Sequence, residues 1–214
     1  MIRGVGFDLD NTLYKQDEYY YRVFEAFACK HSLNSNVLIA AYESSKTCSD
    51  IFGDVLKKIN YYSDTYQQEL FTIYQTINIR IALSTDVIDL LNHLKQSNIH
   101  TAVVTNGVIA AQRNKVKCLG LENLVDHVIY ARQWGKEYEK PDTRPFQELI
   151  NRLHLKPYQV LFVGDSCNTD IKGAKNTNIT AVYMGSENEC KSDYHIRNIS
   201  EVKNIIAKCN TTLG

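Results

Sequence analysis

Residues 4–14 read Gly-Val-Gly-Phe-Asp-Leu-Asp-Asn-Thr-Leu-Tyr, a short apolar run followed by a segment with two aspartates. The first four residues, Gly4–Phe7, form a short apolar run that is typical of a strand buried on both faces of a parallel sheet. Asp8 and Asp10 follow directly, so two carboxylates lie where the predicted strand passes into a loop. Ligands of open parallel sheets bind at the carboxyl ends of strands, which makes this strand end a candidate site.

Four further apolar runs repeat this pattern and predict further buried strands. They are Thr101–Val104, Val128–Tyr130, Val160–Val163 and Thr180–Tyr183. Amphipathic stretches between and after them predict helices. These are Thr85–Gln96, Ile109–Leu119, Pro145–Leu153, Asp170–Asn176 and Ser200–Cys209. Alternating strands and helices predict an α/β fold, with a doubly wound, Rossmann-like parallel sheet.

The segment from Tyr14 to Ile81 lacks this alternation and shows only helix-like spacing of its apolar residues. It is too long for a simple crossover between two strands. We predict a helical cap domain of about four helices over residues 15–81, inserted into a core domain formed by residues 1–14 and 82–214. The insertion is rich in tyrosine. Packing between helices is the simpler expectation for these rings, and lining a substrate pocket is the alternative.

Composition excludes several classes of function. The 214 residues suit one domain, or a core domain with an insertion. The 24 basic residues balance the 24 acidic ones, so the chain has no basic field for nucleic acid or an anionic membrane surface. No window is apolar enough to span a bilayer, and the N-terminus lacks the apolar stretch of a signal peptide, so we expect a cytoplasmic location. The six cysteines are widely scattered, and most are expected to be reduced packing residues.

Polar residues also follow the second and third predicted strands. Thr105, Asn106 and Gly107 bring together a hydroxyl, a carboxamide and a flexible backbone ahead of a helix, where they could hold phosphate oxygens. Lys140 follows the third strand, and Pro141 biases it away from helical conformation. Its ammonium could neutralise charge on a transferring phosphoryl group. Each feature alone also fits an ordinary turn or a solvated surface lysine.

The fourth predicted strand again ends in carboxylates, Asp165 and then Asp170. Mg²⁺ prefers one or two carboxylates together with water and substrate oxygens, so Asp165 with Asp8 forms a candidate magnesium site. A carboxylate such as Asp8 can attack phosphorus and form an aspartyl-phosphate. A second carboxyl, such as that of Asp10, can protonate the leaving oxygen and then activate water. The four strand ends together predict one crevice holding acids, a cation and phosphate donors.

These four strand ends resemble the motifs of the haloacid dehalogenase superfamily of phosphohydrolases. The matching segments are Asp8-Leu9-Asp10-Asn11-Thr12, Thr105-Asn106-Gly107, Lys140-Pro141-Asp142, and Gly164-Asp165 through Asp170, in the order of the family. The chain also looks like the subgroup that carries a helical cap after the first motif, which agrees with the interpretation of residues 15–81.

The resemblance implies a role for each matching residue. Asp8 would be the nucleophile and a Mg²⁺ ligand, Asp10 the general acid/base with its backbone carbonyl on the metal, and Asp165 the remaining metal carboxylate. Lys140 would bridge Asp8 and the phosphoryl group.

The other matching residues would support these. Thr105 and Asn106 would hold the phosphate, and Thr12 would steady the first loop. Asp170 would orient Lys140 or a metal-bound water.

The sequence thus predicts a Mg²⁺-dependent phosphomonoester hydrolase that acts on a small phosphorylated metabolite, a nucleotide or a sugar phosphate, through an aspartyl-phosphate on Asp8. Dehalogenases of this superfamily lack the second aspartate of the first motif, so Asp10 favours phosphate chemistry. A phosphate-group mutase of the same fold is one alternative. A regulatory module that binds phosphate without turnover is the other.

Overall fold

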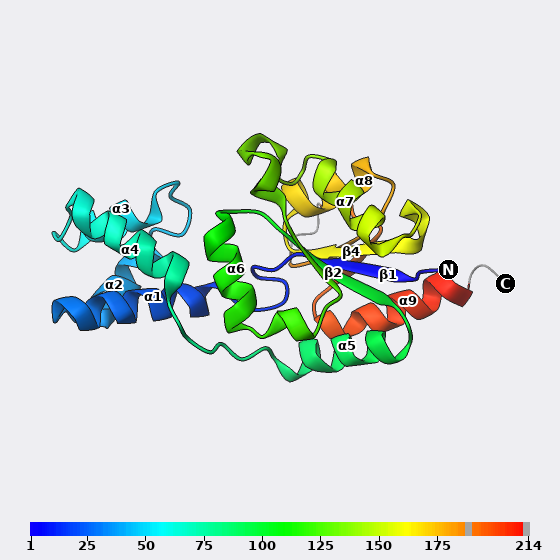
Figure 1. Cartoon of the computed structure of the whole chain (residues 1–214), viewed down its shortest axis with the longest axis horizontal. Helices are drawn as coiled ribbons and strands as arrows, with labels where there is room; N and C mark the ends of the chain where they lie inside the picture. The colour runs from blue at the N-terminus through cyan, green and yellow to red at the C-terminus, as the bar shows by residue number, and fades with distance from the viewer. Residues whose placement is uncertain (187–189, 212–214) are drawn as a thin grey trace.

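The computed structural model describes residues 1–186 and 190–211, and within them it contains a six-stranded parallel sheet (Figure 1). The strands are β1 (Gly4–Phe7), β2 (His100–Thr105), β3 (His127–Tyr130), β4 (Val160–Gly164), β5 (Thr180–Met184) and β6 (Tyr194–Ile196). Their order across the sheet is β3-β2-β1-β4-β5-β6, and every neighbouring pair is parallel. The chain therefore starts in the middle of the sheet and winds outward to both edges, as predicted for a doubly wound fold.

Helices cover both faces of this sheet (Figure 1). Those of the core are α5 (Thr85–Gln96), α6 (Ile109–Cys118), α7 (Arg144–Leu153), α8 (Lys172–Asn176) and α9 (Val202–Thr211). Val103 on β2 belongs to the apolar cluster that includes α5 and α9, whereas its neighbours Ala102 and Val104 belong to the cluster with α7 and α8. Successive strand residues point to opposite faces, so β2 contributes to both cores, which explains its continuous apolar run.

Four further helices lie together beside the sheet rather than on it (Figure 1). They are α1 (Gln16–His31), α2 (Ser35–Glu43), α3 (Ile51–Lys58) and α4 (Asp64–Thr76), and they fill the expected helical stretch. Tyr20 on α1 packs between Tyr42 and Tyr74, with ring centroids 4.8 and 5.3 Å away. Tyrosine rings therefore do pack between these helices. Tyr20 and Tyr74 also line a cavity of about 550 Å³, but that this cavity holds a substrate stays an expectation.

The described structure departs from the predicted elements in three places. The helix predicted over Ser200–Cys209 runs instead over Val202–Thr211 as α9. The edge strand β6 was not predicted, because three residues are too few to show a strand pattern. The helix predicted from Asp170 begins as α8 at Lys172, after a wide helical turn over Cys167–Ile171. Among residues 1–186 and 190–211, no helix has both the length and the apolarity to cross a membrane.

Candidate active site

The carboxyl ends of β1, β2 and β4 lie side by side, because Phe7 is level with Val103 on one neighbour and with Val163 on the other. The polar residues that follow these strands surround a cavity of about 210 Å³. The predicted site residues on its wall are Asp8, Asp10, Thr105, Asn106, Lys140, Asp165 and Asp170. Residues up to 162 positions apart in the sequence therefore meet at one edge of the sheet.

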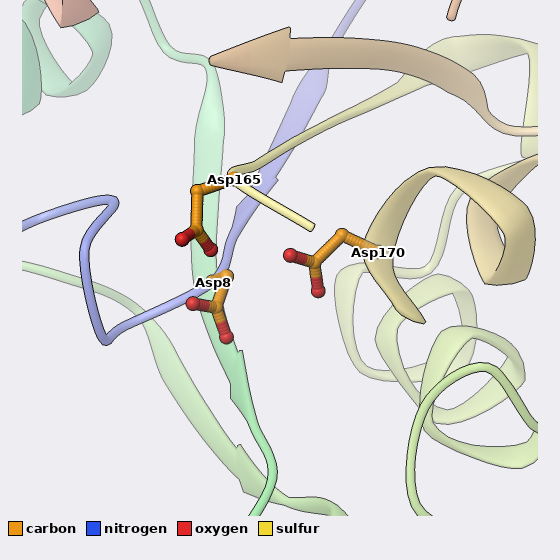
Figure 2. Close-up of side chains that lie close together, drawn as sticks. All are labelled: Asp8, Asp165 and Asp170. Atoms are coloured by element: carbon orange, nitrogen blue, oxygen red, sulfur yellow. The ribbon is translucent and has the colours of Figure 1, made fainter. Parts of the chain in front are cut away.

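Three carboxylates face one another at these strand ends, those of Asp8, Asp165 and Asp170 (Figure 2). One oxygen from each lies within 4.8 Å of the other two. Lys140 Nζ is 2.5 Å from Asp8 Oδ1 and 2.7 Å from Asp170 Oδ1, and it also donates to the carbonyl of Val104 at 2.8 Å. Asp8, Asp170 and Lys140 are buried, whereas Asp165 is half-buried.

The charges of this cluster do not balance. Burial raises the pKa of Asp8 to about 8 against the attraction of Lys140, and burial also raises the pKa of Asp165 to about 6. Burial alone would lower the pKa of Lys140, but the carboxylates of Asp170 and Asp8 outweigh it and raise that pKa. One ammonium among three carboxylates leaves two negative charges uncompensated when all are ionised. A divalent cation with oxygen ligands fits this donor set and this charge.

Gly164 allows Asp170 to reach the cluster. A Cβ at this last residue of β4 would lie 2.4 Å from both Cβ and Oδ2 of Asp170, so only glycine leaves room for that side chain. The loop then turns back through Ser166, whose backbone N–H donates to Asp170 Oδ2 at 3.1 Å and whose hydroxyl accepts from the N–H of Thr169 at 3.3 Å. These contacts hold Asp170 against Lys140.

Asp10 lies on the same wall, but its carboxylate binds a different lysine. Lys115 Nζ is 2.9 Å from Oδ1 and 3.0 Å from Oδ2 of Asp10. Gln112 Nε2 donates to Oδ2 at 2.9 Å, and the Tyr14 hydroxyl donates to Oδ1 at 2.6 Å. Burial would raise the pKa of Asp10, but Lys115 outweighs it and lowers that pKa below its ordinary value. The side-chain cluster that could hold a metal thus consists of Asp8, Asp165 and Asp170, and a metal contact of the Asp10 backbone carbonyl stays a prediction.

Lys115, Gln112 and Tyr14 were not singled out from the sequence. A signal for Lys115 does exist, because it occupies the apolar stripe of α6 with Ala111 and Cys118, both buried, and buried Leu119 follows directly after the helix. A lysine in such a stripe must find a counter-charge, since an unpaired buried charge is costly. The pattern could have indicated a buried ion pair, although it could not have named Asp10 as the partner.

The second motif holds the loop that carries Lys140. The carboxamide of Asn106 binds the backbone of Lys140 with both of its polar atoms, donating to the carbonyl at 3.0 Å and accepting from the N–H at 2.9 Å. The N–H of Gly107 donates to Glu139 Oε1 at 2.5 Å, and Arg132 Nε donates to the same oxygen at 2.9 Å. These two predicted phosphate ligands therefore have protein partners in this structure.

Thr105 and Thr12, two further predicted site residues, differ in the hydrogen bonding of their hydroxyls. Thr105 is buried, and its hydroxyl accepts from Gln112 Nε2 at 2.5 Å, which links the second motif to the partners of Asp10. Thr12 is also buried, but its hydroxyl has no hydrogen-bond partner among the described residues. The first loop is instead closed by its backbone, with the N–H of Leu13 donating to the carbonyl of Leu9 at 3.0 Å.

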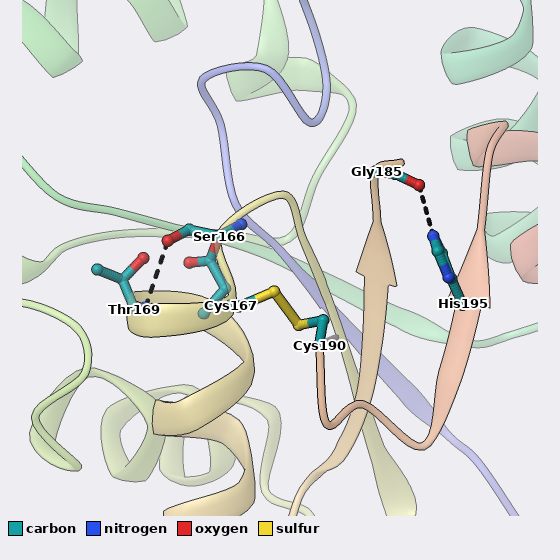
Figure 3. The surroundings of a disulfide bond; sticks show 7 residues. Ser166, Cys167, Thr169, Gly185, Cys190 and His195 are labelled. Carbon is teal, nitrogen blue, oxygen red and sulfur yellow. Dashed lines mark hydrogen bonds between the residues drawn. A yellow bond between two sulfur atoms is a disulfide. The ribbon is translucent and has the colours of Figure 1, made fainter. Parts of the chain in front are cut away.

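One pair of cysteines departs from the expectation of reduced thiols. Cys167, in the loop between Asp165 and Asp170, forms a disulfide with Cys190 (Figure 3). The two residues are 23 positions apart, and no spacing motif links them. Cys29, Cys48, Cys118 and Cys209 are free thiols, as expected, but only Cys118 is buried and Cys29 is exposed, so the expectation of packing residues does not hold for all of them.

Comparison with known proteins places this site in a family. Residues 5–184 match the family described as haloacid dehalogenase-like hydrolase. A curated relative, the glyceraldehyde 3-phosphate phosphatase of Methanocaldococcus jannaschii, is 29% identical over 228 residues, covering 96% of this chain and 97% of that protein.

Two solved structures share the fold. The HAD phosphatase of Thermococcus onnurineus superimposes with a TM-score of 0.64 at 25% identity, over 96% of this chain and 98% of that one. YfnB of Bacillus subtilis, solved with bound magnesium, has a TM-score of 0.73 at 21% identity, also over 96% and 98%. The family match covers most of the chain and all four groups of site residues up to Asp170. The chain therefore belongs to the haloacid dehalogenase-like hydrolase family, as an enzyme of its phosphatase branch.

Proposed function

We propose that this enzyme is a Mg²⁺-dependent phosphomonoester hydrolase, with Asp8 as the nucleophile and Asp10 as the general acid/base. The observation that carries the proposal is the separate placement of these two carboxylates on one cavity wall. Asp8 belongs to the carboxylate cluster with Lys140, whereas Asp10 is paired with Lys115. Two carboxylates in different surroundings suit two different roles in one reaction.

The first step joins Asp8 to the substrate. A carboxylate oxygen of Asp8 attacks phosphorus, the bond from phosphorus to the ester oxygen breaks, and that oxygen takes the proton of Asp10. Lys140, 2.5 Å from Asp8, offsets the negative charge of the phosphoryl oxygens. Asp8, Asp165 and the backbone carbonyl of Asp10 would hold Mg²⁺, which when bound neutralises further phosphate charge.

The second step regenerates Asp8. Asp10, now a carboxylate, takes a proton from water while the water oxygen attacks phosphorus, and the bond from phosphorus to Asp8 breaks to release inorganic phosphate. Thr105 and Asn106 would hold the phosphoryl oxygens, Asn106 through its backbone rather than its carboxamide, because both polar atoms of the carboxamide bind the backbone of Lys140. Asp170 would keep Lys140 oriented through their 2.7 Å ion pair. Thr12 would support the loop that carries both aspartates.

We further propose residues 15–81 as a cap domain over a core formed by residues 1–14 and 82–214. The cavity lined by Tyr20 and Tyr74 lies entirely among residues of this segment, which supports treating its helices as a unit of their own. The relative in M. jannaschii is named for glyceraldehyde 3-phosphate, which supports a small phosphorylated metabolite of the sugar phosphate type. A cytoplasmic location remains part of the proposal.

The test is release of inorganic phosphate from 4-nitrophenyl phosphate, with Mg²⁺ and with EDTA, for the parent and for Asp8→Asn. Asp89→Asn is the matched control, because it makes the same chemical change at an exposed position on α5. We expect metal-dependent turnover in the parent and the control, and none in Asp8→Asn. Turnover that survives in Asp8→Asn would refute the nucleophile.

A panel of sugar phosphates and nucleotides then separates the alternatives. Phosphate release identifies a hydrolase, whereas a product with its phosphate at a new position and no phosphate release identifies a mutase. Substrate binding without either product would favour the regulatory module.

A further inference from the structure

We propose that Lys115 is the positioning residue for the acid/base carboxylate of Asp10, a role that rests on the function proposed above. Lys115 is fully buried, and its ammonium contacts both carboxylate oxygens of Asp10, at 2.9 and 3.0 Å. A cation that contacts both oxygens fixes the plane of the carboxylate as well as its distance.

The other contacts of Asp10 complete this arrangement. The Tyr14 hydroxyl donates to Oδ1 at 2.6 Å, and Gln112 Nε2 donates to Oδ2 at 2.9 Å. These two donors and the two contacts from Lys115 approach both oxygens of the carboxylate, while 20% of the Asp10 side chain stays exposed to the cavity. Asp10 is thus held at one orientation on the cavity wall rather than left to rotate.

Lys115 also contacts the cap. Its ammonium lies 5.5 Å from the ring centroid of Tyr19 on α1 and 5.2 Å from that of Tyr74 on α4, within range of cation–π attraction. Asn114, the preceding residue of α6, donates to the Tyr19 hydroxyl at 2.8 Å and to the carbonyl of Ile77 at 2.7 Å. The residue that holds Asp10 is therefore itself held between the core and the cap helices.

A purely structural ion pair is the competing explanation, since a buried lysine needs a counter-charge in any protein. The two explanations differ in the reaction step that they affect. A structural pair affects folding and all steps alike. A positioning residue affects only the proton transfers of Asp10, to the ester oxygen in the first step and from water in the second. Lys115 itself gives up no proton in either step.

Substrates with different leaving groups distinguish the structural explanation from the positioning explanation. The 4-nitrophenolate anion departs without needing a proton, so formation of the aspartyl-phosphate from 4-nitrophenyl phosphate depends little on Asp10. An alkyl phosphate leaves a strongly basic alkoxide, so its first step needs the proton. Attack of water on the aspartyl-phosphate needs Asp10 for both substrates.

The experiment compares Lys115→Met, Lys115→Arg and the control Asn114→Ala, which loses contacts between α6 and the cap but does not touch Asp10. For Lys115→Met we expect kcat/KM to fall by about 10²-fold or more with methyl phosphate. With 4-nitrophenyl phosphate we expect kcat/KM to stay near the parent value while kcat and KM fall together and a burst of 4-nitrophenol appears. Lys115→Arg should restore part of the loss, because a guanidinium also binds both oxygens of a carboxylate. Asn114→Ala should show no dependence on the leaving group.

Equal losses with both substrates in a folded Lys115→Met would overturn the inference, as would the same leaving-group dependence in Asn114→Ala. If Lys115→Met does not fold, Tyr14→Phe replaces it, because this change removes one donor to Asp10 and keeps the ring. It should show the same dependence to a smaller degree, and its absence would also count against the inference. A parent that releases no phosphate would instead refute the proposed function itself, which keeps the two failures distinguishable.

Discussion

Replacing Gly164 with alanine should disorganise the carboxylate cluster through a single methyl group. The new Cβ would lie 2.4 Å from Cβ and from Oδ2 of Asp170, whereas carbon atoms in ordinary contact are about 3.5 Å apart. Asp170 must therefore withdraw by about 1 Å. That movement stretches its 2.7 Å ion pair with Lys140 and its 3.1 Å hydrogen bond from the N–H of Ser166.

The expected effects on stability and activity follow from this movement. Overpacking at a buried position costs about 1–3 kcal/mol, and loosening a buried ion pair moves the loss toward the upper end of that range. We therefore expect the free energy of unfolding to fall by about 3 kcal/mol. Misplacing a catalytic group by about 1 Å can cost about 10²-fold in rate, so kcat/KM should fall by a comparable factor.

The assay combines urea unfolding, followed by tryptophan fluorescence, with Mg²⁺-dependent release of 4-nitrophenol. Gly4→Ala is the matched control, because its Cβ would lie 2.6 Å from Leu155 Cδ1 and 2.8 Å from Leu153 Cδ1, at the other end of the same sheet. This control should lose stability but keep the kcat/KM of the parent. Parent-like activity in Gly164→Ala would refute the reasoning, and so would an equal loss of activity in Gly4→Ala.

Three further predictions concern charge and covalent linkage. Asp10→Asn should lower kcat with an alkyl phosphate by about 10²–10⁴-fold. It should also lower the free energy of unfolding by about 3 kcal/mol, because Lys115 loses its counter-charge. Unchanged stability would contradict the ion pair. The pKa values of Asp8 and Asp165 are raised in the folded state, to about 8 and about 6. In EDTA, the folded state therefore binds more protons than the unfolded state between about pH 4 and about pH 8. The melting temperature should fall as the pH rises through this window. Mg²⁺ competes with these protons, so its stabilisation should grow over the same window, and a melting temperature in EDTA that rises with pH would count against the raised values. Under oxidising conditions, Cys190→Ser should lower the free energy of unfolding by about 3 kcal/mol, as expected for a disulfide that closes a loop of this length. The parent protein with a reducing agent should show the same loss. A parent whose stability does not change on reduction would argue against the disulfide.

Much of the fold could be predicted because local patterns determine it. Val103 and its apolar neighbours had to be buried on both sides, and polar residues such as Asp8 and Asp165 followed directly after apolar runs. In a parallel sheet, strand ends share one edge, so residues far apart in the sequence could be assigned to one crevice. The helical insertion was evident from the loss of strand patterning between Tyr14 and Ile81.

Contacts that depend on the path of the chain through space could not be predicted. Nothing local indicates that Lys115 meets Asp10, because their separation of 105 residues is closed only when α6 packs against the first loop. The carboxamide of Asn106 could bind a phosphate or a backbone equally well, and only the position of the Lys140 loop decides between them. The pairing of Cys167 with Cys190 likewise depends on where the chain returns after β5.

Asp8 and Asp10 have charge environments opposite to those that the proposed reaction requires. Burial raises the pKa of Asp8 to about 8, although a nucleophile must be ionised, and Lys115 outweighs burial to lower the pKa of Asp10, although an acid must carry a proton. The reactants themselves can reverse both conditions. A divalent cation beside Asp8 favours its ionised form, and a phosphate dianion entering the cavity favours the protonated form of Asp10. In the proposed reaction, metal and substrate would therefore supply the charges that prepare both carboxylates. The pairing of Asp8 with Lys140 and of Asp10 with Lys115 is consistent with this proposal, because separate cations allow the two carboxylates to change their ionisation in opposite directions.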